Sequence, residues 1–209
     1  GMATIAEGDG SHLAYLNDDL VMEYIEQGLK HQVAVILDVQ MGALSATKAL
    51  EPVMKYLKYP NVHLALDPEF AMKKPGQDVP GNPIGYITGA EINEAQAYIQ
   101  NYLEENKIRG RRILIVHQFF DAMIPNKAVI DWTNPRVELT IVADGFGPPG
   151  PKIVKYNDFF PADTPVRYTG LKLFNHWDEP LITDAQALGE ERFTQKTFVD
   201  VTPNILIWQ

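Results

Sequence analysis

The sequence predicts an α/β protein built as a parallel (β/α) barrel of TIM type. Short apolar runs rich in β-branched residues recur along the chain, and most of them lack the polar alternation of a half-exposed strand. Strands that are buried on both faces of a parallel sheet have this pattern. The runs start roughly 25 to 50 residues apart, which is the spacing of strand–helix–strand units. They cover residues 3–6, 33–39, 62–66, 113–116, 137–142, 171–174 and 205–208.

The segments between these runs carry helical patterns. Asn17 precedes a stretch with apolar residues at helical spacing and is the predicted N-cap. Thr88 and Glu91 form a capping-box pattern before a second amphipathic stretch. Residues 45–59 are also helical in pattern, and Pro52 is expected to kink or restart that helix.

Alternating strands and helices predict a parallel sheet, either open or closed into a barrel. We favour the barrel because residues 8–11 lack the full glycine spacing that follows the first strand of an open nucleotide-binding sheet. Seven strands are visible, whereas a closed barrel of this type has eight. We therefore expect a single barrel domain over residues 1–209 that has lost one strand at its N-terminus. The connections after Gln118 and Asp144 are rich in proline and glycine, so we expect at most short helices there.

The composition argues against several classes of protein. A net charge of −9 disfavours a nucleic-acid partner, because binding to phosphates needs clustered Lys and Arg. The absence of cysteine excludes thiolate metal sites, thiol nucleophiles and disulfides. No run of about 18 apolar residues is present, so no transmembrane segment is expected. No cofactor is indicated, and the oligomeric state is not predicted.

Polar residues follow nearly every apolar run. In a parallel barrel the C-terminal ends of the strands meet at one rim, where active sites are built. Strands that simply meet solvent also end in polar residues, but that alternative predicts Gly, Ser and Lys about as often as Asp, Glu and His. The pattern therefore favours a functional mouth lined with carboxylates. The residues at the strand ends are Glu7, Asp38, Gln40, Asp67, Glu69, His117, Gln118, Asp144, Lys172, Trp208 and Gln209.

The sharpest local signal is Asp67-Pro68-Glu69. Residues two apart on a strand share a face, so both carboxylates are expected to point into the mouth. Repulsion between them favours keeping a proton on one, and an acid beside an ionised partner is what cleavage of a glycosidic bond requires. We therefore predict Glu69 as the proton donor and Asp67 as its second carboxylate. The alternative is an Asp-Pro pair that opens a loop beside a solvated Glu69.

Lys172 lies inside an apolar run, so it needs a carboxylate partner or an environment that favours its neutral form. An ion pair with Asp144 or Glu69 is the first interpretation, and a Schiff-base lysine as in class I aldolases is the second. His117 ends another run, where it has either a functional role or a packing role. Asp38, Glu69, His117 and Asp144 are also an alternative ligand set for a divalent cation, but no metal-binding spacing supports them and no metal is predicted.

Five of these stretches resemble an uncharacterised bacterial family of glycosidase-like barrels, whose members are often exported or lipid-anchored. The stretches are Leu37-Asp38-Val39-Gln40, Leu66-Asp67-Pro68-Glu69, Val116-His117-Gln118-Phe119, Ala143-Asp144-Gly145-Phe146-Gly147 and Gly170-Leu171-Lys172-Leu173-Phe174. Residues 64–69 also resemble the strand-four Asp-x-Glu ending of chitinase-like and lysozyme-like barrels. The two further aspartates of the chitinase pattern are absent. The resemblance implies a glycosidase-like barrel and an extracytoplasmic location.

The sequence therefore predicts a carbohydrate-active hydrolase that acts on a bacterial or extracellular polysaccharide. Asp67 and Glu69 are its predicted catalytic pair. Aromatic residues near the strand ends, among them Phe146 and Trp177, suit stacking on sugar rings. A non-catalytic polysaccharide-binding barrel and a lyase or aldolase that uses Lys172 are the alternatives. The predicted substrate-binding residues are Asp38, Gln40, His117, Gln118, Asp144, Lys172 and Trp208.

Overall fold

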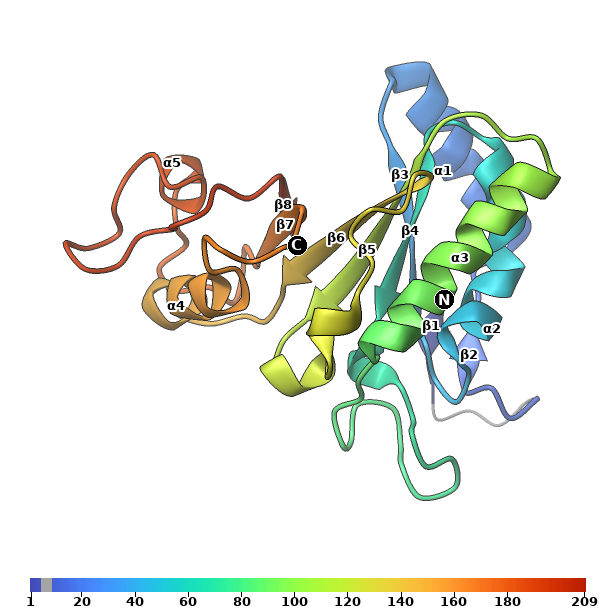
Figure 1. The fold of residues 1–209 in the computed structure, drawn as a ribbon, viewed down its shortest axis with the longest axis horizontal. Helices are drawn as coiled ribbons and strands as arrows, with labels where there is room; N and C mark the ends of the chain where they lie inside the picture. Colours follow the sequence, from blue (N-terminus) through green and yellow to red (C-terminus); the bar gives the residue numbers. More distant parts are fainter. Residues whose placement is uncertain (5–8) are drawn as a thin grey trace. The chain divides into compact units, whose positions relative to one another are not determined.

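The computed structural model covers residues 1–209 and describes all of them except residues 5–8. The described residues form an α/β fold with a six-stranded parallel sheet and a two-stranded antiparallel sheet (Figure 1). The strands of the parallel sheet lie in chain order. They are β3 (Val35–Gln40), β4 (Val62–Asp67), β5 (Arg112–Gln118), β6 (Val137–Ala143), β7 (Tyr168–Leu173) and β8 (Ile205–Trp208).

The prediction of a (β/α) barrel of TIM type is wrong. The last six predicted strands are parallel neighbours in chain order, but β3 and β8 are the edge strands of this sheet in the described part of the chain. The first predicted strand is not part of the parallel sheet. Met2–Ala3 forms β1, which pairs antiparallel with β2 (Leu13–Ala14). A parallel partner requires a helical crossover of a dozen or more residues, and only nine residues separate the two strands, which favours the antiparallel pairing. The rest of that predicted strand and its polar end, residues 5–7, lie outside the described residues.

The chain divides into two compact units. Unit 1 contains residues 1–116 and 122–139, and unit 2 contains residues 117–121 and 140–209. Strands β5 and β6 contribute residues to both units, so the prediction of one domain over the whole chain stays a prediction.

Two helices of unit 1 begin where the sequence predicts. The first, α1 (Asp18–His31), follows Asn17, whose side chain accepts a hydrogen bond from a backbone N–H of the first turn at 2.8 Å. The second, α3 (Gly89–Glu105), opens with a complete capping box: the hydroxyl of Thr88 accepts from the N–H of Glu91, and the carboxylate of Glu91 accepts from the N–H of Thr88. Both caps satisfy N–H groups that a helix leaves unpaired at its start.

The predicted interruption at Pro52 is confirmed. Helix α2 (Ala46–Leu50) is only five residues long, and the chain continues as the 3-10 helix η1 (Glu51–Lys58). Proline has no N–H to donate, so the α-helical bonding pattern cannot pass through it. Figure 1 shows α2 and α3 lying side by side along the strands of unit 1, and the two helices are in contact. The remaining 3-10 turns are η2 (Pro68–Phe70), η3 (Asp121–Met123) and η4 (Lys127–Val129).

The longest described helix, α3, is amphipathic. Ile92, Ala95, Ile99 and Leu103 are buried and form its apolar face, while Tyr102, which the sequence pattern places on the same face, is only half-buried. Charged and amide residues occupy its other faces. Among the described residues no helix has both the length and the apolar composition needed to cross a bilayer.

In unit 2, helix α4 (Pro149–Phe159) is longer than the short helix that the sequence predicts. Pro149 occupies the first turn, where its missing N–H costs no hydrogen bond. Tyr156 then anchors the helix: its hydroxyl lies 2.7 Å from the hydroxyl of Thr169 on β7 and donates to the carbonyl of Val201 at 2.8 Å. Burial raises the pKa of Tyr156 to about 12. A short helix, α5 (Asp184–Ala187), follows later in the same unit.

Candidate functional site

Three of the predicted site residues meet in unit 2. His117 lies in β5, Asp144 follows β6 directly, and Lys172 lies in β7, so they come from the C-terminal ends of three successive strands. The Nδ1 of His117 is 3.0 Å from Oδ2 of Asp144, and the Nζ of Lys172 is 2.9 Å from the same oxygen. All three side chains are at most 14% exposed. The ion pair between Lys172 and Asp144 is the first of the two interpretations that the sequence supports, and the Schiff-base role stays a prediction.

The charge of Asp144 is stabilised by its neighbours. Burial by itself would raise the pKa of this carboxyl, but the contact with His117 and the ammonium of Lys172 outweigh it and hold the pKa of Asp144 well below its usual range. The carboxylate is therefore ionised at neutral pH, accepts a hydrogen bond from Lys172 and lies against the imidazole of His117.

We expect Asp144→Asn to lower the free energy of unfolding by about 1–3 kcal/mol at pH 7, because a charged hydrogen-bond partner of Lys172 is lost. The depressed pKa means that the contribution of Asp144 is present above the ordinary carboxyl pKa of about 3.9 and is lost as the pH falls towards the lower folded value. The stability gap between wild type and variant should therefore narrow between pH 6 and pH 2. Denaturant titrations over that range measure it, and a constant gap would contradict this account of Asp144.

A second ion pair in unit 2, between Lys152 of α4 and Asp178, was not predicted. Both side chains are at most 6% exposed. The carboxylate of Asp178 also accepts the N–H of Gly147 at 2.8 Å and the N–H of Phe174 at 2.9 Å, and Lys152 donates to the carbonyl of Lys172 at 2.9 Å. This pair therefore joins α4 to the loop after β6 and to the end of β7.

A sequence signal for Lys152 does exist. Lys152, Tyr156 and Phe159 lie at positions i, i+4 and i+7, so the lysine is on the buried face of α4. The prolines and glycines before the helix predict at most a short helix, which is too short to define a buried face.

An aromatic cluster lies next to these charges in unit 2. Phe146 is 64% exposed and Trp177 is 60% exposed, and their ring centroids are 5.5 Å apart. Trp177 also stacks on the buried ring of Phe174 at 5.6 Å. The ammonium groups of Lys172 and Lys152 each lie 5.1 Å from the centroid of Phe174. Phe174 therefore contacts both the exposed ring of Trp177 and the two buried ammonium groups.

Asp67 and Glu69 belong to unit 1. Asp67 is the last residue of β4, and Glu69 lies in the 3-10 turn η2 that follows. Pro68 cannot donate to the strand ladder, and regular pairing stops there as its chemistry predicts, so Glu69 lies beyond the strand. The side chain of Asp67 accepts a hydrogen bond from the backbone N–H of Glu69 at 3.2 Å. Both residues are half-buried, and their catalytic role stays a prediction.

Gln40 and Asp67 are partners in the register of β3 and β4, so these two predicted residues are adjacent at the strand ends. The side-chain oxygen of Gln40 accepts the N–H of Ala3 at 2.8 Å, which ties the antiparallel sheet to β3.

In unit 2, Gln118 is fully buried and donates to the carbonyl of Phe120 at 3.3 Å. Trp208 is 41% exposed on β8. Among the described residues no three His, Asp or Glu side chains gather as metal ligands would.

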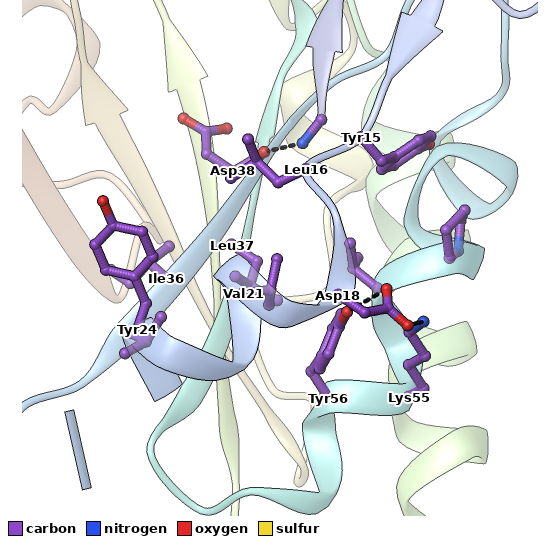
Figure 2. Close-up of a pocket in the computed structure, with 14 residues that line it drawn as sticks. Tyr15, Leu16, Asp18, Val21, Tyr24, Ile36, Leu37, Asp38, Lys55 and Tyr56 are labelled. Carbon is purple, nitrogen blue, oxygen red and sulfur yellow. Dashed lines mark hydrogen bonds and ion pairs between the residues drawn. The ribbon is translucent and has the colours of Figure 1, made fainter. Parts of the chain in front are cut away.

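Asp38 lines a cavity of about 450 Å³ in unit 1, shown in Figure 2. The cavity lies between α1, β3 and η1, and its wall is largely apolar. Its polar groups are engaged in internal contacts. Asp18 accepts the hydroxyl of Tyr56 at 2.7 Å and pairs with Lys55, and Tyr15 donates to the carbonyl of Ala49 at 2.8 Å. A ligand in this cavity would therefore contact mainly apolar side chains and few polar groups.

The fold and the ion-paired cluster define an α/β protein with a charged, aromatic-flanked site at the ends of parallel strands. Comparison of the chain with known protein families, with curated proteins and with solved structures finds no match. The resemblance to a family of glycosidase-like barrels stays a prediction. The function is therefore inferred from the chemistry of the site.

Proposed function

We propose that the protein binds carbohydrate through the cluster in unit 2. The observation that carries this proposal is the pair of exposed rings, Phe146 and Trp177, beside the ion-paired Asp144 and Lys172. Large aromatic side chains are seldom left exposed as a group without a binding role. Sugar rings have apolar C–H faces that stack on such rings and hydroxyls that need fixed donors and acceptors.

The charged groups supply those polar contacts. An ammonium has three donor hydrogens, and the contact with Asp144 uses one donor of Lys172. The carboxylate of Asp144 has further acceptor positions beyond those used by Lys172, His117 and its bond to Gly145. A sugar that stacks on Trp177 thus finds donors and acceptors whose positions are fixed by burial and pairing.

Hydrolysis is the activity that we propose for the full chain, with Glu69 as acid and Asp67 as second carboxylate. The side chain of Asp67 caps the turn η2 by accepting the N–H of Glu69, so the two residues are neighbours at the end of β4. A bacterial or extracellular polysaccharide is the proposed substrate, in an extracytoplasmic location. The binding protein without turnover and the Lys172 lyase remain the alternatives.

Trp177→Ala tests the binding site. We expect the affinity for any polysaccharide that the wild type binds to fall about tenfold or more, because the stacking surface is removed. Tyr24→Ala is a matched control, since Tyr24 is also 60% exposed but lines the cavity in unit 1. Affinity electrophoresis or calorimetry across a polysaccharide panel, together with reducing-end release, measures binding and turnover. A loss with Tyr24→Ala but not with Trp177→Ala would overturn the proposal.

A further inference from the structure

One lysine of α4 has no carboxylate partner. The Nζ of Lys155 is 4.2 Å from the centroid of the Phe119 ring, and it forms no ion pair with any residue that the structure describes. A Cβ placed on Gly145 would lie 3.0 Å from this nitrogen, so the ammonium lies against the backbone that follows Asp144. By contrast, Lys172 is paired with Asp144, and Lys152 is paired with another carboxylate.

Lys155 is thus the one of three neighbouring ammonium groups that has no ion pair with a described residue, whereas Lys152 is paired with Asp178 and Lys172 with Asp144. Burial lowers the pKa of Lys155, and the charge of Lys152 lowers it further, while Asp144 acts in the opposite direction. A partly buried cation in such a place is stabilised more by an anion than by a neutral group.

Lys155 also lines a hollow of about 490 Å³ in unit 2, a volume within the range of small-ligand sites. Asp121 and Asp158 are among its other lining residues, and neither forms an ion pair with Lys155. A simple anion would be repelled by these two carboxylates. A molecule that carries both an anionic group and hydroxyl groups can bind the ammonium and donate to the carboxylates at once.

We propose that this hollow binds an acidic saccharide, whose carboxylate or sulfate group contacts the ammonium of Lys155. The proposal rests on the proposed carbohydrate function and names its substrate class. The chain as a whole carries a net charge of −9, which repels polyanions at long range. If the protein nevertheless prefers an acidic polysaccharide over its neutral counterpart, the preference arises from contacts in this hollow and not from the net charge of the chain.

The test compares pairs of polymers that share a backbone: polygalacturonate with its fully methyl-esterified form, and dextran sulfate with dextran. We expect the wild type to bind the acidic member of at least one pair about tenfold or more tightly, and the pair that shows this identifies the anion. Lys155→Gln should bring the two members of that pair to similar affinity. Lys196→Gln is the matched control, because Lys196 is an exposed lysine of unit 2, and it should leave the preference intact.

Equal binding of both members of each pair would overturn the acidic-saccharide inference, as would equal losses with Lys155→Gln and Lys196→Gln. If neutral polymers bind through Trp177 without an acidic preference, the proposed function survives and this inference alone fails. If none of the four polymers and no other polysaccharide binds, the proposed function fails as well. Circular dichroism of both variants checks that they are folded.

Discussion

Asp178→Ala is expected to lower the free energy of unfolding by about 3–5 kcal/mol, because it leaves the ammonium of Lys152 buried without a counter-charge. The pair is among the least exposed ionic contacts that the structure describes. The substitution also removes the acceptor of two backbone N–H groups, those of Gly147 and Phe174. Three donors lose this acceptor at once, Lys152 keeps only the carbonyl of Lys172, and α4 loses its tie to the loop after β6.

Denaturant titration at pH 7 measures this loss. Glu51→Ala is the control, because its ion pair with Lys48 is exposed on both sides and such pairs stabilise little. The double change Lys152→Met with Asp178→Leu should recover much of the stability, since removing both buried charges avoids the unpaired one. If Asp178→Ala is no more destabilising than Glu51→Ala, the pair does not hold this part of unit 2 together.

Glu69→Gln is expected to reduce turnover of a hydrolysed polysaccharide by ~10²–10⁴-fold while binding is retained. Glutamine keeps the size and hydrogen-bonding reach of the side chain, but it has no proton to deliver to a leaving group. Glu69 lies in η2 of unit 1, whereas Trp177 belongs to unit 2. We therefore expect Glu69→Gln to leave the stacking of a sugar on Trp177 unchanged.

Reducing-end release from the polysaccharide that binds most tightly is the measurement for Glu69. Glu94→Gln, at an exposed position of α3, makes the same chemical change away from η2 and should leave the rate unchanged. Full activity in Glu69→Gln would show that Glu69 is not the acid. Binding without any turnover in the wild type would favour the non-catalytic alternative.

Much of the fold follows from local patterns. Continuous apolar runs are typical of parallel strands buried on both faces, and the six from β3 to β8 form the sheet in chain order. The caps at Asn17 and Thr88 and the break at Pro52 depend on single residues whose chemistry acts locally. Barrel closure, in contrast, depends on how many strands pair and in what order. The apolar character of residues 3–6 contains no information on whether their partner is parallel or antiparallel.

The site was predictable where it depends on strand ends. His117, Asp144 and Lys172 contact one another because successive parallel strands end at the same edge of a sheet. Lys152, Lys155 and Asp178 were missed because their positions depend on α4 and on the chain after β7. Those contacts are long-range, and a Gly- and Pro-rich segment such as residues 145–151 gives no periodicity from which to predict them.

The proposal that the protein binds carbohydrate through the cluster in unit 2 is tested most directly by a crystal structure with a bound oligosaccharide. The oligosaccharide is taken from the polysaccharide that the protein binds most tightly. The account predicts a sugar ring stacked on Trp177 or Phe146, with hydroxyl groups within hydrogen-bonding distance of Asp144 or Lys172. A sugar found instead in the unit 1 cavity beside Tyr24 and Asp38 would contradict it.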